Sequence, residues 1–300
     1  MITSDNKLQH NYLKLQAKNP MPTITALIIY PIKSCAGITL REATLTSAGL
    51  RTQLANDREW MVVDLAGQFL TQRQIPQMAL IVPHLHPQGL RLTAPGMSAL
   101  DIPFILPVWT PTLVRVWDDD VIAQDCGEVA AEWFSIALGV PCRLVRFDPD
   151  SQRMASKKWT GGRAVPTRFS DGYPILLTSQ ASLDDLNQKL RAQGRDALPM
   201  NRFRPNIVID GVEAFEEDYA ETLSTAKIRL QPVKPCPRCP IPSIDQATGK
   251  PGPDPLDILQ SYRINPKVDG GITFGMNTIL LEGEGEIMRV GEEIDMALAF

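Results

Sequence analysis

Histidine is scarce in this chain, which contains only His10, His84 and His86. A mechanism of the Ser-His-Asp type is therefore not expected. The sequence also has no glycine-rich phosphate loop of the Walker or Rossmann type, no Gly-x-Ser-x-Gly elbow and no His-Glu-x-x-His pair. The usual signatures of nucleotide-binding proteins, serine hydrolases and zinc proteases are thus missing.

Long apolar runs and a strong net charge are lacking as well. No apolar run approaches the ~20 residues of a transmembrane helix, and residues 1–20 lack the hydrophobic core of a secretory signal. The net charge of −4 gives no general reason to expect nucleic acid or an anionic membrane as a partner. The odd number of cysteines, five, favours a reducing compartment over a disulfide framework. We therefore expect a cytoplasmic protein.

Length and composition indicate two globular domains, because 300 residues with 44% hydrophobic side chains can bury a sizeable core. We expect a flexible leader at residues 1–21, an N-terminal β-barrel-like domain at 22–145 and a second domain at 146–300. Several short apolar runs in 22–145 end at Gly, Pro, Asp or Asn, as strands of a barrel do. These predicted strands are Ile24–Tyr30, Trp60–Asp64, Ala79–Val82, Leu113–Trp117 and Val121–Gln124.

Two helices and further strands complete the predicted secondary structure. Glu128–Leu138 has one apolar face and Gly139 to cap it, and Gln180–Arg191 has leucines on one face and Ser179 as N-cap. Strands and helices do not alternate regularly, so the predicted fold class is α+β, mainly β. The remaining predicted strands are Pro174–Thr178, Asn206–Ile209, Lys227–Gln231, Ile279–Leu281 and Glu286–Arg289.

One long segment has no periodicity. Asp148–Phe169 is rich in charged and small residues, and it includes the run Lys157–Arg163 (KKWTGGR). Long loops of this kind commonly serve function. We interpret the segment as an exposed loop that borders a site.

The most informative motif is Lys234–Pro240 (KPCPRCP), in which Cys236 and Cys239 flank Arg238. So many prolines exclude a helix, and we expect a rigid loop that presents one or both thiols beside a fixed positive charge. Such a setting favours the thiolate, the form that binds metals and attacks electrophiles. The pattern alone leaves three alternatives open: half of a zinc site, a redox pair, or a proline-rich loop with inert thiols.

Cationic residues follow two predicted strands. Lys33 and Ser34 lie in a turn after the first strand, where a lysine, a hydroxyl and exposed amides suit a phosphate or another oxyanion. Arg204 and Asn206 precede a later strand, and a guanidinium can bind phosphate through two hydrogen bonds. Arg58 follows Asp57, with which a simple ion pair is an equal explanation. Together these residues suggest a protein that holds a phosphate-bearing cofactor and offers it one thiolate.

In this combination the chain resembles the MOSC family, named after the C-terminal domain of molybdenum cofactor sulfurase. It is most similar to the branch with an N-terminal β-barrel domain, which includes the mitochondrial amidoxime-reducing components and their bacterial relatives. The resemblance spans about residues 23–297. It is carried by Tyr30–Gly37 with Gly49-Leu50 and Asp57-Arg58, by Ser179–Leu183 with Leu186-Asn187 and Phe203–Val208, and by Cys236–Cys239 with Asp245, Thr248-Gly249, Pro255-Leu256, Tyr262-Arg263, Phe274-Gly275 and Val290-Gly291.

The resemblance implies a MOSC β-barrel domain with peripheral helices after the N-terminal one, and molybdopterin bound in a cleft between them. It implies that Cys239 is the thiolate ligand of molybdenum. A soft thiolate suits such a metal. Asp245 is our candidate for a proton relay near the metal, with a turn cap as the alternative. The positions that resemble cofactor contacts of the family are Lys33, Ser34, Arg58, Thr178, Arg204 and Asn206.

The activity implied is reduction of N-hydroxylated small molecules by removal of their oxygen atom at a Cys-ligated molybdenum centre. The alternative is a sulfur carrier, or a protein that delivers the molybdenum cofactor, with a persulfide on Cys239. The chain ends at Phe300 without the cysteines of the ferredoxin domain found in several bacterial relatives, and it lacks a mitochondrial targeting segment. We therefore expect a separate electron-donor protein, either a reductase or a ferredoxin.

Overall fold

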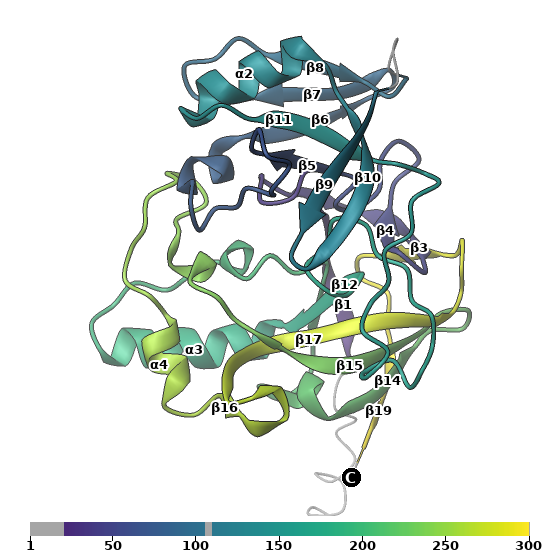
Figure 1. Cartoon of the computed structure of the whole chain (residues 1–300). Coiled ribbons are helices and arrows are strands. Elements are labelled where there is room, and N and C mark those ends of the chain that lie inside the picture. Colours follow the sequence, from purple (N-terminus) through teal and green to yellow (C-terminus); the bar gives the residue numbers. More distant parts are fainter. Residues whose placement is uncertain (1–20, 106–109, 300) are drawn as a thin grey trace, which may run out of the picture.

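The computed structural model describes residues 21–105 and 110–299. Strands dominate, and few helices lie at the periphery (Figure 1). The prediction of a mainly β, α+β protein is confirmed. The predicted leader at residues 1–21 lies outside the described residues, apart from Met21.

The largest sheet has nine strands in the order β19-β14-β15-β17-β12-β13-β1-β2, with β16 paired to the start of β17. Almost all of its neighbours run antiparallel, but β12 and β13 are parallel. The strands are β1 (Thr23–Ile29), β2 (Ile38–Leu40), β12 (Ile175–Ser179), β13 (Ile207–Asp210), β14 (Ala220–Ser224), β15 (Arg229–Pro237), β16 (Ile264–Asn265), β17 (Gly271–Glu282) and β19 (Asp295–Leu298).

Three smaller sheets complete the β structure. Their orders are β5-β11-β10-β9, β18-β3-β4 and β6-β7-β8. Their strands are β3 (Glu42–Thr46), β4 (Gly49–Arg51), β5 (Trp60–Val63), β6 (Val82–His86), β7 (Gly89–Thr93), β8 (Leu100–Pro103), β9 (Pro111–Val116), β10 (Asp119–Asp125), β11 (Arg143–Phe147) and β18 (Ile287–Arg289).

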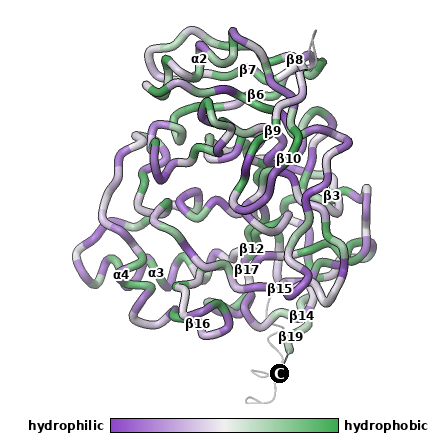
Figure 2. The backbone as a smooth tube through the Cα atoms, viewed as in Figure 1, coloured by the Kyte–Doolittle hydropathy of each residue, from purple (hydrophilic) through white to green (hydrophobic). Residues whose placement is uncertain are grey.

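The helices begin and end where the sequence indicates. The Ser179 hydroxyl accepts a hydrogen bond from the Ser182 amide at the start of α3, and Gly139 ends α2 in the left-handed conformation. Helix α3 contains both hydrophilic and hydrophobic residues (Figure 2), and its leucines pack with Phe203 and with Phe274 of β17. The helices are α2 (Glu128–Leu138), α3 (Gln180–Ala192) and α4 (Leu256–Gln260), with 3₁₀ turns η1 (Pro76–Leu80), η2 (Met200–Arg202), η3 (Glu216–Tyr219), η4 (Ile241–Ser243) and η5 (Pro266–Val268).

In the part of the chain that the structure describes, no helix is long and apolar enough to span a membrane.

Two local predictions were wrong. The predicted strand Ala79–Val82 is instead the end of η1 followed by the start of β6, because Pro76 begins a 3₁₀ turn. The predicted loop at residues 234–240 is in its first half the end of β15. Its prolines are accommodated because the β15–β17 register shifts between Pro232 and Lys234 and again between Pro235 and Pro237.

The two halves of the sequence interleave in space. β1 pairs with β13 of the second half, with Leu27 opposite Ile207, and β18 pairs with β3, with Met288 opposite Ala43. Apolar residues from both halves therefore share one core, which includes Leu27, Leu45 and Leu177. The predicted boundary near residue 145 divides the chain in sequence, but the large sheet crosses it. This pairing places the turn after β1 against the strands of the second half.

Gly275 lies in β17 beside β12, and its backbone requires glycine. Its φ is +77°, and an added Cβ would lie 2.6 Å from the carbonyl oxygen of Leu177. Gly285 has a similar φ of +84°, but an added Cβ there meets nothing within 4 Å. We expect Gly285→Ala to cost about 1 kcal/mol and Gly275→Ala clearly more, about 3 kcal/mol, in the free energy of unfolding. Urea unfolding of both variants measures this; equal losses would contradict the steric reason.

Candidate functional site

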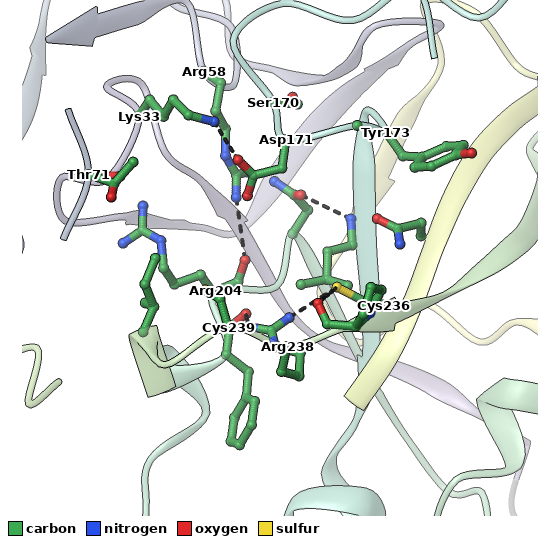
Figure 3. A pocket seen from close by; sticks show the side chains of 18 of the residues that line it. Lys33, Arg58, Thr71, Ser170, Asp171, Tyr173, Arg204, Cys236, Arg238 and Cys239 are labelled. Atoms are coloured by element: carbon green, nitrogen blue, oxygen red, sulfur yellow. Dashed lines mark hydrogen bonds and ion pairs between the residues drawn. The ribbon is translucent and has the colours of Figure 1, made fainter. Parts of the chain in front are cut away.

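A cleft is lined by the turn after β1, by residues 170–173 before β12, and by residues of β12, β15 and β17 (Figure 3). All but two of the predicted site residues line it. Those that line it are Lys33, Ser34, Arg58, Arg204, Asn206 and Cys239. The other lining residues are Thr71, Arg73, Ser170, Asp171, Gly172, Tyr173, Leu176, Phe203, Cys236, Pro237, Arg238, Ile241 and Asn277.

Both thiols of the proline-rich motif lie at one wall of this cleft (Figure 3). Cys236 is at the end of β15 and Cys239 follows the strand, and both side chains are partly exposed. Arg238 donates one hydrogen bond to Cys236 Sγ, at 3.3 Å, and another to the carbonyl oxygen of Phe203, at 2.7 Å. The expected positive charge beside the thiols is therefore present and held in place.

Lys33 reaches the opposite side of the cleft from the turn after β1. Its Nζ donates to the carbonyl oxygen of Phe169 at 2.8 Å and to Asp171 at 2.6 Å. Burial lowers the pKa of Lys33, and the neighbouring carboxylate acts in the opposite direction. Desolvation acts to raise the pKa of Asp171, but the Lys33 ammonium outweighs it and holds the pKa well below its usual value. The two groups thus form an ion pair, with Asp171 at the exposed rim.

Two guanidinium groups stack on one tyrosine behind the cleft. The Arg58 and Arg204 guanidinium carbons lie 4.3 Å and 4.2 Å from the centre of the Tyr30 ring. Arg58 is paired with the buried Asp57 at 2.5 Å. Arg204 is 9% exposed and has no carboxylate partner among residues 21–105 and 110–299. Burial lowers its pKa, although a guanidinium stays charged in proteins. Arg204 is thus a buried, unpaired cation that faces the cleft.

Backbone strain is concentrated here. Ser34, Arg58 and Arg204 have φ values of +66°, +48° and +56°, in the left-handed region that side chains other than glycine rarely adopt. Such a conformation costs of order 1–3 kcal/mol and persists only where the surroundings enforce it. Three strained residues around one cleft indicate that their positions are selected for something other than stability.

Asn206 and Ser34 line the cleft and also hydrogen-bond to neighbouring segments of the protein. The Asn206 amide donates to the Ile28 carbonyl at 3.0 Å and accepts from the Leu176 amide at 3.1 Å, so it joins β1 to β12. The Ser34 carbonyl accepts from Gln72 at 2.7 Å. Asn206 therefore shapes the wall of the cleft, where its side-chain amide joins two strands.

Thr178 and Asp245 do not line the cleft. Thr178 is fully buried and its hydroxyl lies 3.4 Å from Met200 Sδ. Asp245 pairs with Arg202 at 2.7 Å and accepts the Thr248 amide at 2.8 Å, as a turn cap does. Desolvation acts to raise its pKa, but hydrogen bonds from Thr248 outweigh it and lower the pKa. A low pKa does not suit a proton relay at neutral pH, so we carry the relay role no further.

The sequence analysis missed several lining residues, above all Asp171 and Arg73. Asp171 also accepts a hydrogen bond from Trp117 Nε1, at 3.2 Å, and Arg73 stacks on the Trp117 ring at 4.7 Å. Trp117 is at the tip of the β9–β10 hairpin, so this hairpin contacts the cleft rim. The only signal in the sequence was the end of the irregular segment, where Asp171 stands just before a predicted strand.

The side chains of the cleft suit an anionic ligand that contains a metal able to bind a thiolate. Five cations and one carboxylate line it, in a protein of net charge −4. Two buried polar atoms of lining residues, Ser170 Oγ and Arg238 Nε, have no hydrogen-bond partner among the described residues. A ligand with hydrogen-bonding groups in the cleft could pair with both atoms. The residues present therefore fit a phosphate-bearing cofactor whose metal takes one thiolate.

The other interpretations of the cysteine pair have less support. All five cysteines are free, and within the described ranges no three His, Cys, Asp or Glu side chains gather to hold a metal ion. A structural zinc site would need four such ligands. The pair also does not precede a regular α-helix, as a thioredoxin-like pair would, since only the short η4 follows.

Comparisons with known proteins agree with this picture. Residues 21–141 match the MOSC N-terminal beta barrel domain and residues 165–295 match the MOSC domain. The chain is 37% identical to mitochondrial amidoxime reducing component 2 of Rattus norvegicus over 81% of this chain and 72% of that protein. It is 34% identical to mitochondrial amidoxime-reducing component 1 of Mus musculus, over 91% and 81%. It is also 34% identical to molybdenum cofactor sulfurase of Bos taurus, over 90% of this chain and 32% of that protein. The chain therefore belongs to the family of two-domain MOSC proteins that includes the mitochondrial amidoxime-reducing components.

Proposed function

We propose that this protein binds the molybdenum cofactor in the cleft and reduces N-hydroxylated small molecules. The observation that carries the proposal is the cleft itself, where a partly exposed thiol faces a group of cations that few carboxylates neutralise. The names of the relatives, amidoxime-reducing components, support the reaction class.

In this proposal Cys239 provides the thiolate ligand of molybdenum. Arg238 fixes the loop that carries it, because its guanidinium is anchored on the carbonyl oxygen of Phe203. Lys33, Arg58 and Arg204 neutralise the phosphate and the polar edges of the pterin. A guanidinium can do so through two parallel hydrogen bonds, each strengthened by charge.

The cofactor, when bound, supplies the two-electron oxygen-atom chemistry. The chain holds it, orients it and keeps one side open, because both cysteines are partly exposed at the mouth of the cleft. A small N-hydroxylated molecule approaches from this open side. Asp171 and Lys33 lie at the opposite rim. There this ion pair can shield the phosphate end of the cofactor from solvent.

A sulfur carrier is the second candidate, supported by the similarity to molybdenum cofactor sulfurase. In that case Cys239 would carry a persulfide. The buried and unpaired Arg204 favours the reductase, since a bare persulfide carrier has no use for a cationic cleft. A protein that delivers the cofactor would keep the cleft but would show no turnover.

We predict that the purified, cofactor-loaded chain reduces an amidoxime with reduced viologen as electron source, and does not do so with NADPH alone. The reason is that the sequence has neither a dinucleotide fingerprint nor a four-cysteine iron–sulfur set to relay electrons. Product formation under both conditions measures this. Strong NADPH-dependent activity of the pure chain would refute the need for a separate donor protein.

No turnover with any reductant, despite full molybdenum loading, would instead favour the delivery or carrier role. The control is the same assay with protein that has lost its metal. Activity in that control would exclude the cofactor as the site of reaction.

A further inference from the structure

A group of basic side chains beside the cleft has no part in the proposed function. Residues 151–170 contain five basic residues and no acidic one. Lys157, Lys158 and Arg163 are exposed at the tip of this loop, and the partly exposed Lys234 of β15 lies next to it. We call these four residues the basic patch.

The base of the loop that carries the basic patch is fixed by hydrogen bonds, an ion pair and apolar packing. The Ala155 amide donates to Val165 at 2.9 Å, and the Thr167 amide donates to Arg153 at 2.8 Å. Arg153 itself is buried and pairs with Asp119 at 2.7 Å. Ala155 and Val165 pack with residues of β17, so the loop runs along the large sheet (Figure 1). The basic tip therefore has a defined place on the surface.

That place is the edge of the cleft. The Tyr173 hydroxyl donates to the carbonyl oxygen of Ser156 at 3.4 Å, and Tyr173 lines the cleft. Lys234 Nζ lies 5.8 Å from the centre of the Trp159 ring and 5.9 Å from that of Tyr173. Lys234 is also only two residues before Cys236 on β15. The basic patch thus continues directly into the wall that holds the thiols.

The charges of the patch have no ion-pair partner in the part of the chain that the structure describes. Among residues 21–105 and 110–299, no carboxylate lies within ion-pair distance of any of its four side chains, whereas Arg153 at the base of the loop is paired with Asp119. Four like charges side by side gain nothing for folding, but they attract an anionic surface and raise its rate of association.

We infer that the basic patch is the docking surface of an acidic one-electron carrier protein. The inference depends on the proposed function, in which a separate protein supplies electrons. Complexes of electron carriers are small and transient, and complementary charge contributes more to them than buried apolar area. A carrier seated on Lys157, Lys158 and Arg163 would lie against the thiol side of the cleft, next to the metal.

The test uses the cofactor-loaded full chain and an acidic plant-type 2Fe–2S ferredoxin as the probe. The triple variant Lys157→Glu, Lys158→Glu, Arg163→Glu is expected to weaken ferredoxin binding about tenfold or more at low ionic strength, and to flatten its salt dependence. Calorimetric binding in a salt series measures both. The single variant Lys157→Glu should show a smaller shift in the same direction, and it serves if the triple variant fails to fold.

Arg191→Glu is the matched control. Arg191 is exposed in the last turn of α3. The apolar face of α3 packs with Ile258 and Leu259 of α4, and none of its residues belongs to the cluster that includes Trp159. This control makes one charge reversal, like Lys157→Glu, and it should leave ferredoxin binding unchanged.

Turnover separates this inference from the proposed function. Viologen-driven turnover of the triple variant should equal that of the parent, and ferredoxin-driven turnover should fall with binding. A parent without viologen-driven turnover would refute the proposed function, while the binding result would still stand. The docking surface is wrong if the parent does not bind ferredoxin, if the triple variant binds as the parent does, or if Arg191→Glu weakens binding as much as Lys157→Glu. Patch-dependent binding to phosphatidylserine vesicles without ferredoxin binding would also overturn it, in favour of a membrane.

Discussion

Replacing Cys239 by serine is expected to abolish molybdenum retention and activity while the fold remains intact. A hydroxyl is a hard and weakly acidic ligand, and it cannot replace the thiolate that a soft metal centre prefers. The side chain is partly exposed, so the change removes little packing. Metal analysis and thermal unfolding of the purified variant measure the two parts of this prediction.

Cys236→Ser is the matched control, because its thiol lies at the same wall of the cleft. We expect only partial loss in this variant, since Cys236 is hydrogen-bonded to Arg238 and is not the assigned ligand. Normal metal content in Cys239→Ser would refute the ligand assignment. Equal loss in both variants would point instead to a dithiol mechanism.

Arg204→Ala is expected to weaken retention of the cofactor by about 1.5–3 kcal/mol, or roughly one to two orders of magnitude in affinity. Arg204 is the buried cation without a carboxylate partner, so a ligand is its natural counter-charge. The variant keeps a side chain at φ +56°, so the backbone strain is unchanged. Pterin fluorescence during dilution or dialysis measures retention.

Lys33→Ala should reduce retention less than Arg204→Ala, because Lys33 already has Asp171 as its partner. Arg51→Ala, at an exposed position outside the cleft, is the control for loss of an arginine. If Arg204→Ala binds the pterin as tightly as the parent, its guanidinium has only a structural role on the Tyr30 ring. That result would remove the main cation from our description of the site.

The parts of the site that could be predicted lie at the ends of strands. Lys33 follows β1, Arg204 precedes β13, and Cys239 follows β15. Strand ends that neighbour one another in a sheet bring such residues together, even when the chain separates them by 170 residues or more. Residue type and motif were therefore sufficient to identify them.

Whether a predicted residue lines the cleft depends on which way its side chain points. Thr178 lies on β12 two residues after Leu176, which lines the cleft, but Met200 of η2 covers it. Resemblance to a family gives the position of such a residue along the chain, and it cannot show what packs over it. Asp171 was missed for a different reason, because it lies between the irregular segment and the next predicted strand, where no periodicity places a side chain.

The interleaving of the two halves was also beyond the sequence. Local patterns predict that Thr23–Ile29 and Ile207–Asp210 are strands, but no local pattern shows that they pair with each other. Pairing across such a separation is decided by burial of the shared apolar face, as in the contact of Leu27 with the core that contains Leu177. Local patterns also do not show that β15 can contain several prolines, because this depends on shifts in its register against β17.

The most direct test of the account is the molybdenum and pterin content of the parent protein, purified fresh from a cell that makes the cofactor. We predict stoichiometric molybdenum and pterin that stay with the folded chain through gel filtration, because the cleft supplies both the thiolate and the cations that the cofactor requires. A folded protein that carries neither, and that takes up neither from added cofactor, would contradict the account.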